Sequence, residues 1–113
     1  MSTNTVDLGK LVPGTVVVYK FKLEAGENHF MLPPQSIFLD VAFQDNELCV
    51  WAVIPFSGQL MPLRLLVAAT GSTFPNQAGL RYIGTARQIQ KYVSHGTHHV
   101  QHSHFVLHVF ELP

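Results

Sequence analysis

The chain has 113 residues, enough for one domain with a modest hydrophobic core. Seven Lys and Arg residues balance seven Asp and Glu residues, and this zero net charge argues against binding of long nucleic acid, which needs a basic surface. Charged residues make up only 12% of the chain and apolar residues 47%, so the surface must be poor in charge. We expect polar uncharged residues and histidines to cover part of it, and a homo-oligomer to cover part of the apolar surface.

The first strands are predicted from alternation of apolar and polar side chains. Residues 1–14 are mostly polar and end in a Pro-Gly turn pair, so we expect an N-terminal arm before a β domain over residues 15–113. Alternation over residues 15–24 predicts a strand with one buried face. A turn at residues 25–28 then leads to a short strand, residues 29–32, which two prolines end.

A hairpin is predicted around Asp45-Asn46. Both residue types tolerate positive φ, which a tight hairpin turn requires. The strand before the turn, residues 36–44, alternates, and one face is expected to hold Ile37, Leu39, Val41 and Phe43. The strand after the turn, residues 47–56, is apolar on both faces, which places it at the centre of a sheet.

The second half of the chain predicts three more strands, over residues 60–70, 80–85 and 105–112. Pro62 places the start of the first of these at an edge or bulge. Residues 86–93 are compatible with a short helix or an irregular extension. About seven short strands separated by turns predict an all-β fold, a single-domain antiparallel sandwich or open barrel of six to eight strands.

A His-rich insertion is expected at about residues 86–104. His102 and His104 are the candidate metal ligands, because residues two apart in a strand project from the same face. No acidic residue lies between Phe56 and Glu111 to complete such a site or to orient an imidazole. We therefore predict polar loop or interface residues here, with no metal centre and no cofactor.

The basic residues of the second half form the candidate ligand site. These are Arg64, Arg81, Arg87 and Lys91, with Tyr82 beside them. No Asp or Glu lies between Gly58 and Phe110, so the local field is positive despite the zero net charge. Guanidinium groups near an aromatic ring suit a small phosphorylated or nucleotide ligand. The alternative is a solvated face that balances the acidic first half.

Several classes of activity lack their sequence signatures. The chain has no G-x-S-x-G elbow, no glycine-rich phosphate loop and no H-E-x-x-H motif, so we expect no enzyme. Cys49 is the only cysteine and lies in an apolar run, which predicts a buried thiol and no intrachain disulfide. No run reaches the roughly 18 apolar residues of a membrane span, and the N-terminus lacks the features of a signal peptide, so a cytoplasmic location is expected.

A series of short motifs runs in order along residues 17–111. The pieces are Leu32-Pro33, residues 39–42, residues 44–46, residues 49–53, Thr70-Gly71, residues 82–85 and residues 105–111. In the pattern L-P, C-x-W-A, T-G, Y-I-G-T and H-x-F-E, the chain resembles short bacteriophage and prophage proteins that share a domain of unknown function. Residues 86–104 depart from the family by their length and their histidines.

The resemblance implies a phage or prophage origin and a compact β domain, and it supplies no catalytic residue. It implies that Trp51 and Phe110 anchor the core. It gives Gly71 and Gly84 special backbone positions, and His108 a structural role.

Two functions remain open at this point. The first is a non-enzymatic binding protein in the cytoplasm of the bacterial host, for example a counter-defence protein that captures a small nucleotide signal or binds a host protein. The alternative is a virion accessory, a decoration or tail component. Neither requires a membrane.

Overall fold

The computed structural model describes residues 3–7, 9, 11–93 and 100–113, and within the two longest strands it describes side chains up to Gln88 and from Phe105 onward. The described residues form eight strands: β1 (Thr3–Thr5), β2 (Val16–Lys22), β3 (Gly26–Leu32), β4 (Ile37–Gln44), β5 (Glu47–Pro55), β6 (Met61–Ala69), β7 (Arg81–Val93) and β8 (Val100–Leu112). Within these ranges, no helix is long and apolar enough to cross a membrane.

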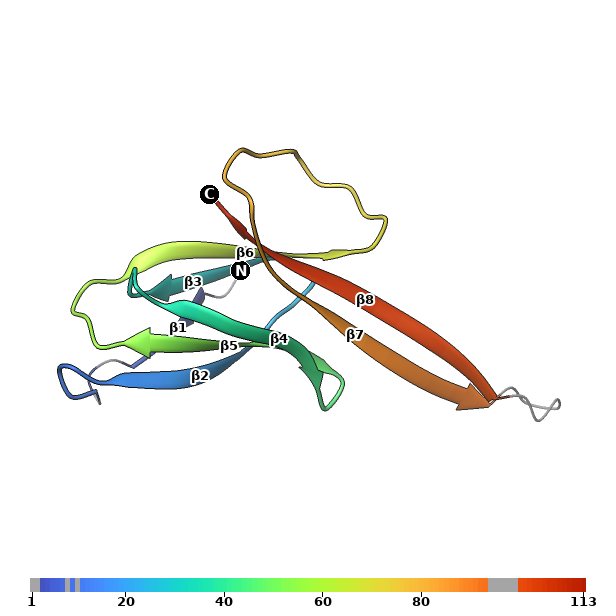
Figure 1. Ribbon diagram of the computed structural model, residues 1–113, viewed down its shortest axis with the longest axis horizontal. Coiled ribbons are helices and arrows are strands. Elements are labelled where there is room, and N and C mark those ends of the chain that lie inside the picture. Colours follow the sequence, from blue (N-terminus) through green and yellow to red (C-terminus); the bar gives the residue numbers. More distant parts are fainter. Residues whose placement is uncertain (1–2, 8, 10, 94–99) are drawn as a thin grey trace.

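The strands form two sheets that pack face to face (Figure 1). The large sheet has the order β1-β3-β6-β8-β7, and the small sheet has the order β2-β5-β4. All neighbours are antiparallel except β1 and β3. The sheets do not close into a barrel, so the predicted all-β fold is confirmed in its sandwich form.

The core lies between the inner faces of the two sheets. Side chains alternate across each strand, so every second residue of β5 and β6 points inward, and Val50, Ile54 and Leu65 are fully buried. Phe21 of the small sheet meets Phe30 of the large sheet edge-on, with ring centroids 5.2 Å apart. The central position predicted for residues 47–56 is confirmed, because β5 lies between β2 and β4.

Because of a β-bulge in β4, the side chains that face the core differ from those predicted. The register with β5 shifts between Phe38 and Asp40, so one extra residue separates the two halves of the strand. Phe38 and Val41 therefore face the core, whereas Ile37 and Leu39, predicted to share a face with Val41, are exposed. At the end of the strand the predicted turn is confirmed, with φ of 52° at Asp45 and 64° at Asn46.

Three further expectations about local structure are corrected. The expected N-terminal arm contains β1, which pairs with β3, and β3 itself begins at Gly26, inside the predicted turn. Residues 86–93 are neither helical nor irregular, because they continue β7 opposite β8. Trp51 and Phe110 lie on the outer faces of their sheets and are only partly buried, so neither anchors the core.

The β7–β8 hairpin makes the molecule elongated (Figure 1). The principal extents are 60 × 33 × 23 Å, and the radius of gyration is 17.1 Å. A compact chain of this length would have a radius of gyration of about 13 Å. The excess comes from the end of the hairpin, which projects beyond the two packed sheets.

Candidate functional site

The hairpin is anchored to the sandwich at Gly84. The pairing of β7 with β8 shifts register between Tyr82 and Gly84, which marks a second bulge. A Cβ atom at Gly84 would lie 3.1 Å from Val41 Cγ2 and 3.2 Å from Val41 Cβ. A side chain at this position would force Val41 to move by a few tenths of an ångström, so glycine suits this close approach of β7 to β4. The special backbone position expected for Gly84 is confirmed, as is that of Gly71, whose φ is 88°.

A row of polar side chains runs across the outer face of the large sheet above this anchor. Tyr82 Oη lies 2.6 Å from Thr85 Oγ1, which lies 3.0 Å from His108 Nδ1. On its other side, His108 Nε2 lies 2.7 Å from Thr70 Oγ1. Both ring nitrogens of His108 are therefore hydrogen-bonded. This geometry agrees with the structural role expected for His108, and it ties β6, β7 and β8 together where the hairpin leaves the sheet.

Beyond this row, the hairpin continues as a two-stranded ribbon. β6 pairs with β8 only from Leu107 onward, so among the described strands residues 100–105 pair with β7 alone. Gln88 makes the outermost described contact with the body, because its Nε2 donates to Asn46 Oδ1 over 2.7 Å. We call the ribbon that begins at this contact, residues 88–93 and 100–105, the arm. It is distinct from the N-terminal arm expected over residues 1–14. Phe105 at its root is 46% exposed.

Arg81 and Tyr82, two of the predicted ligand residues, line a small pocket between the starts of β4 and β7. The pocket has a volume of about 290 Å³ and is completed by Ser36, Ile37, Phe38 and Ile83. Ser36 Oγ is buried and has no hydrogen-bond partner among the described residues. The guanidinium of Arg81 is already paired, because Nη2 lies 2.6 Å from Glu111 Oε1. Ser36 and Tyr82 thus line a pocket in which the Ser36 hydroxyl is itself buried, and the cation of its lining, Arg81, is paired with Glu111.

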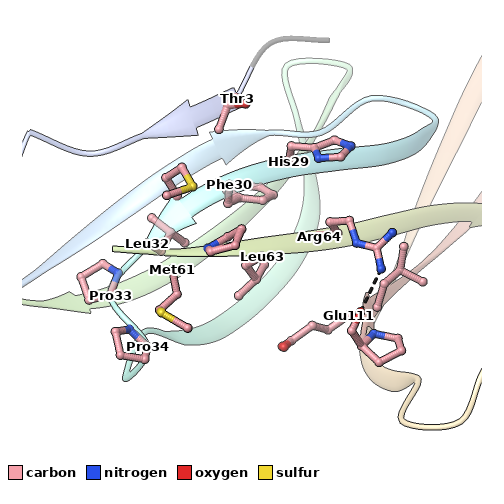
Figure 2. Close-up of a pocket in the computed structure, with 14 residues that line it drawn as sticks. Thr3, His29, Phe30, Leu32, Pro33, Pro34, Met61, Leu63, Arg64 and Glu111 are labelled. Atoms are coloured by element: carbon pink, nitrogen blue, oxygen red, sulfur yellow. Dashed lines mark hydrogen bonds between the residues drawn. The ribbon is translucent and has the colours of Figure 1, made fainter. Parts of the chain in front are cut away.

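Arg64 lies in a different place, a groove of about 580 Å³ at the end of the large sheet (Figure 2). The groove exists because β8 pairs with β6 only as far as Arg64, which leaves Met61–Leu63 without a neighbour on that side among the described strands. Pro62, which has no N–H to offer, occupies this stretch, as its predicted edge position requires. Arg64 Nη2 donates to Pro113 O over 2.8 Å, and Nη1 lies 3.6 Å from Glu27 Oε1.

The predicted basic residues do not converge on one site. Arg81 and Tyr82 share the small pocket, Arg64 lies in the groove, and Arg87 is exposed next to the root of the arm. The side chains of Lys91, His102 and His104 lie outside the described residues, although the backbone of Lys91 is opposite that of His102. The described cations Arg64 and Arg81 each face a carboxylate, which weakens the positive field expected for this half.

Sequence reasoning missed the partners that complete these sites. The sequence could have indicated Glu111 as the partner of a cation, because it is the only acidic residue after Glu47 and lies in a half with four cations. No sequence feature identifies Ser36, Thr70 or Thr85 as site residues, because their roles depend on which strands become neighbours. The part of the chain that the structure describes contains no group of three or more His, Cys, Asp or Glu side chains able to hold a metal ion.

Comparison with known proteins adds one result. The family model for a domain of unknown function, DUF7352, matches residues 15–113, which is nearly the whole chain. No curated protein and no solved structure gives a match.

Proposed function

Because the chain belongs to the family that shares the domain of unknown function DUF7352, and this family match names no activity, we propose a function from the geometry. The protein is a non-enzymatic binding protein that recognises another protein through the arm. The resemblance to phage and prophage proteins makes a bacterial host protein the proposed partner, and the host cytoplasm the proposed location. A counter-defence role fits this setting.

The observation that supports the proposal is the arm itself. A two-stranded ribbon in water is only marginally stable without a third strand or a packed face. β7 and β8 nevertheless continue past the body as a ribbon, and residues 100–105 pair on one side only. The unpaired edges present backbone N–H and C=O groups in a row, which is the arrangement that adds a strand from a partner. The arm therefore suits recognition by strand addition.

The composition of the arm indicates the chemistry of its partner. The two arm strands contain Ile89, Tyr92, Val93, Val100 and Phe105, with Lys91 and no Asp or Glu, and Arg87 lies next to the root. Polar residues are interspersed with these, among them Gln90, Gln101 and Ser103, and Lys91 is the one Lys, Arg, Asp or Glu of the two strands. A mixed ribbon with a positive charge complements a mixed surface with acidic groups. We therefore expect an acidic host protein as the partner and binding that weakens with salt.

Shortening the arm tests the proposal. In the variant, residues 89–104 are replaced by Asn-Gly, which closes the hairpin at the pair Gln88 and Phe105. The sandwich core is untouched, so the variant should stay folded and unfold cooperatively. Affinity purification from host lysate, quantified by mass spectrometry, should enrich a defined acidic protein with the full chain and lose it with the short arm.

Two controls make this experiment decisive. Glu24→Lys changes an exposed residue outside the arm and should keep the partner, and raising the salt concentration should release it. Retention of the same protein by the short-arm variant would show that the arm is not the recognition element. Presence of the protein in purified virions, with no host partner, would favour the virion accessory role instead.

A second candidate, capture of a small nucleotide signal, is supported by the pocket at Arg81, Tyr82 and Ser36. Its volume of about 290 Å³ is at the lower limit for ligand sites. A phosphate would also have to compete with Glu111 for Arg81. A thermal-shift panel of cyclic and linear nucleotides distinguishes this candidate, because a ligand that binds only the folded state raises Tm. The short-arm variant retains the pocket and should respond equally.

A further inference from the structure

The outer face of the small sheet is apolar where a solvated sheet face is expected to be polar. Val16 and Val18 of β2 are 60% and 56% exposed, and Ile37 of β4 is 61% exposed. Between them, Trp51 and Val53 of β5 are half-buried. Together with Lys20 and Asp40, these side chains form what we call the small-sheet outer face, and it lies on the sheet that does not carry the arm.

The strand registers arrange this face in two cross-strand rows. In the first row, Val18, Val53 and Ile37 lie side by side on β2, β5 and β4. In the second row, Lys20, Trp51 and Asp40 occupy the same three strands. The second row thus has a basic residue on β2, an aromatic residue on β5 and an acidic residue on β4, and the Lys20 side chain reaches across the sheet to Gln44 of β4.

Lys20 and Asp40 are not paired with opposite charges among the described residues. Lys20 Nζ donates to the neutral amide oxygen of Gln44 over 2.7 Å, and Asp40 Oδ1 accepts the N–H of Val41 over 2.9 Å. The ion pairs between described side chains include neither residue.

We propose that the small-sheet outer face binds a second copy of this chain, through a two-fold axis that runs along β5. Such an axis places β2 of each copy over β4 of the other. Lys20 then exchanges its hydrogen bond to Gln44 for an ion pair with Asp40 of the second copy, once on each side of the axis. Val18 packs on Ile37, and the two Trp51 side chains meet at the axis. The interface is isologous, as expected for a homodimer.

The charges select this orientation over the other face-to-face arrangement. A two-fold axis running across the strands through the second row would place Lys20 over Lys20 and Asp40 over Asp40, which like-charge repulsion opposes. The axis along β5 turns both contacts into attractive ones. Packed sheets cross at about 30°, and this rotation still leaves the rows in register near the axis.

The size of the face sets the expected strength of the dimer. Three strands about 4.8 Å apart and seven residues at about 3.3 Å each cover roughly 330 Å² per copy. The two copies together bury about 650 Å² by this measure, less than the roughly 1,200 Å² of ordinary stable complexes. We therefore expect a reversible dimer that forms at micromolar rather than nanomolar concentrations.

A charge-reversal cycle tests the proposal with the full chain. Sedimentation velocity over a concentration series should show a monomer–dimer equilibrium for the unchanged protein. Lys20→Glu places like charges at both contacts and should weaken association by at least about tenfold. The double variant Lys20→Glu with Asp40→Lys exchanges the charges within each copy and should restore it. Arg87→Glu, the same charge change as Lys20→Glu but at an exposed residue of β7 in the large sheet, should leave association unchanged.

A second variant keeps the test meaningful if a charge reversal unfolds the chain. Val18→Thr preserves shape and β propensity but puts a hydroxyl in the apolar row, so it should weaken the dimer about tenfold while Tm, measured in dilute monomer, stays near the original. A protein that stays monomeric at all concentrations overturns the proposal. So does a double variant that associates no better than Lys20→Glu alone. The arm plays no part in this interface, so the short-arm variant should dimerise as the full chain does.

Discussion

Gly84 of β7 lies against Val41 of β4 so closely that a Cβ atom on the glycine would be 3.1 Å from Val41 Cγ2. This contact holds the hairpin edge of the large sheet onto the small sheet. It is made possible by the bulge between Tyr82 and Gly84, which turns Gly84 and Ala86 inward while Tyr82 and Thr85 face outward. The direction in which the arm leaves the body therefore depends on one glycine.

Gly84→Ala should destabilise the fold by about 1–3 kcal/mol, because Val41 is buried and its Cβ, 3.2 Å from the new atom, cannot move by a rotamer change. Urea unfolding measures the effect. Gly58→Ala is the matched control, since nothing lies within 4 Å of its new Cβ. In the double variant with Val41→Ala, the two effects should be less than additive. Full additivity would mean that the two residues do not make the contact described.

Asp45→Ala should lower the free energy of unfolding by about 1 kcal/mol, because Ala is disfavoured at a φ of 52°. Asp45→Gly removes the same carboxylate but tolerates this conformation, so it should stay within about 0.5 kcal/mol of the original protein. Equal losses in the two variants would point to the carboxylate rather than to the backbone as the source of stability.

Gln88→Ala should loosen the arm without unfolding the body. The lost hydrogen bond to Asn46 is exposed and worth about 1 kcal/mol, so amide exchange in the arm should speed up about fivefold. Exchange at Val50 and Leu65 in the core should not change. Asn46→Asp keeps an acceptor oxygen and tolerates positive φ, and it serves as the matched control. Uniform acceleration across the protein would argue that the contact stabilises the whole fold.

Glu111→Gln should change stability by less than about 1 kcal/mol, since the Arg81 side chain is 67% exposed. It should nevertheless leave an unneutralised guanidinium beside the Ser36 pocket. If that pocket takes a phosphorylated ligand, nucleotides that shift Tm should bind several-fold more tightly to this variant. Glu27→Gln, which removes the carboxylate near Arg64 in the other groove, should have no such effect. Identical responses from the two variants would remove the pocket as the binding site.

Local features of the chain were predictable because they depend on neighbours in sequence. Alternation over residues 15–24 and 36–44 predicts strands, and Asp45-Asn46 predicts the turn whose positive φ values the structure has. The apolar run around Cys49 predicts the burial of its thiol, which is confirmed at 2% exposure. Each of these predictions uses only the period of a strand or the conformational range of one residue type.

The two bulges, and the side-chain faces that depend on them, could not be predicted from local sequence. A single extra residue at Leu39 moves Ile37 from the predicted core face to the solvent, since side chains alternate with a period of two. The bulge in β7 likewise brings Tyr82 and Thr85, three residues apart, onto one face. Nothing in a run of apolar residues reveals a bulge, because the bulge is fixed by the partner strand.

The candidate sites depended still more on tertiary structure. Sequence by itself determined an all-β sandwich or open barrel with one buried cysteine, a tight turn at Asp45-Asn46 and a second half rich in cations and histidines. Only the register between distant strands set Glu111 beside Arg81, separated Arg64 from Arg81, and aligned Lys20 with Asp40 across β5. The physical reason is that strand pairing is non-local: it depends on the packing of both sheets together, which no short segment records.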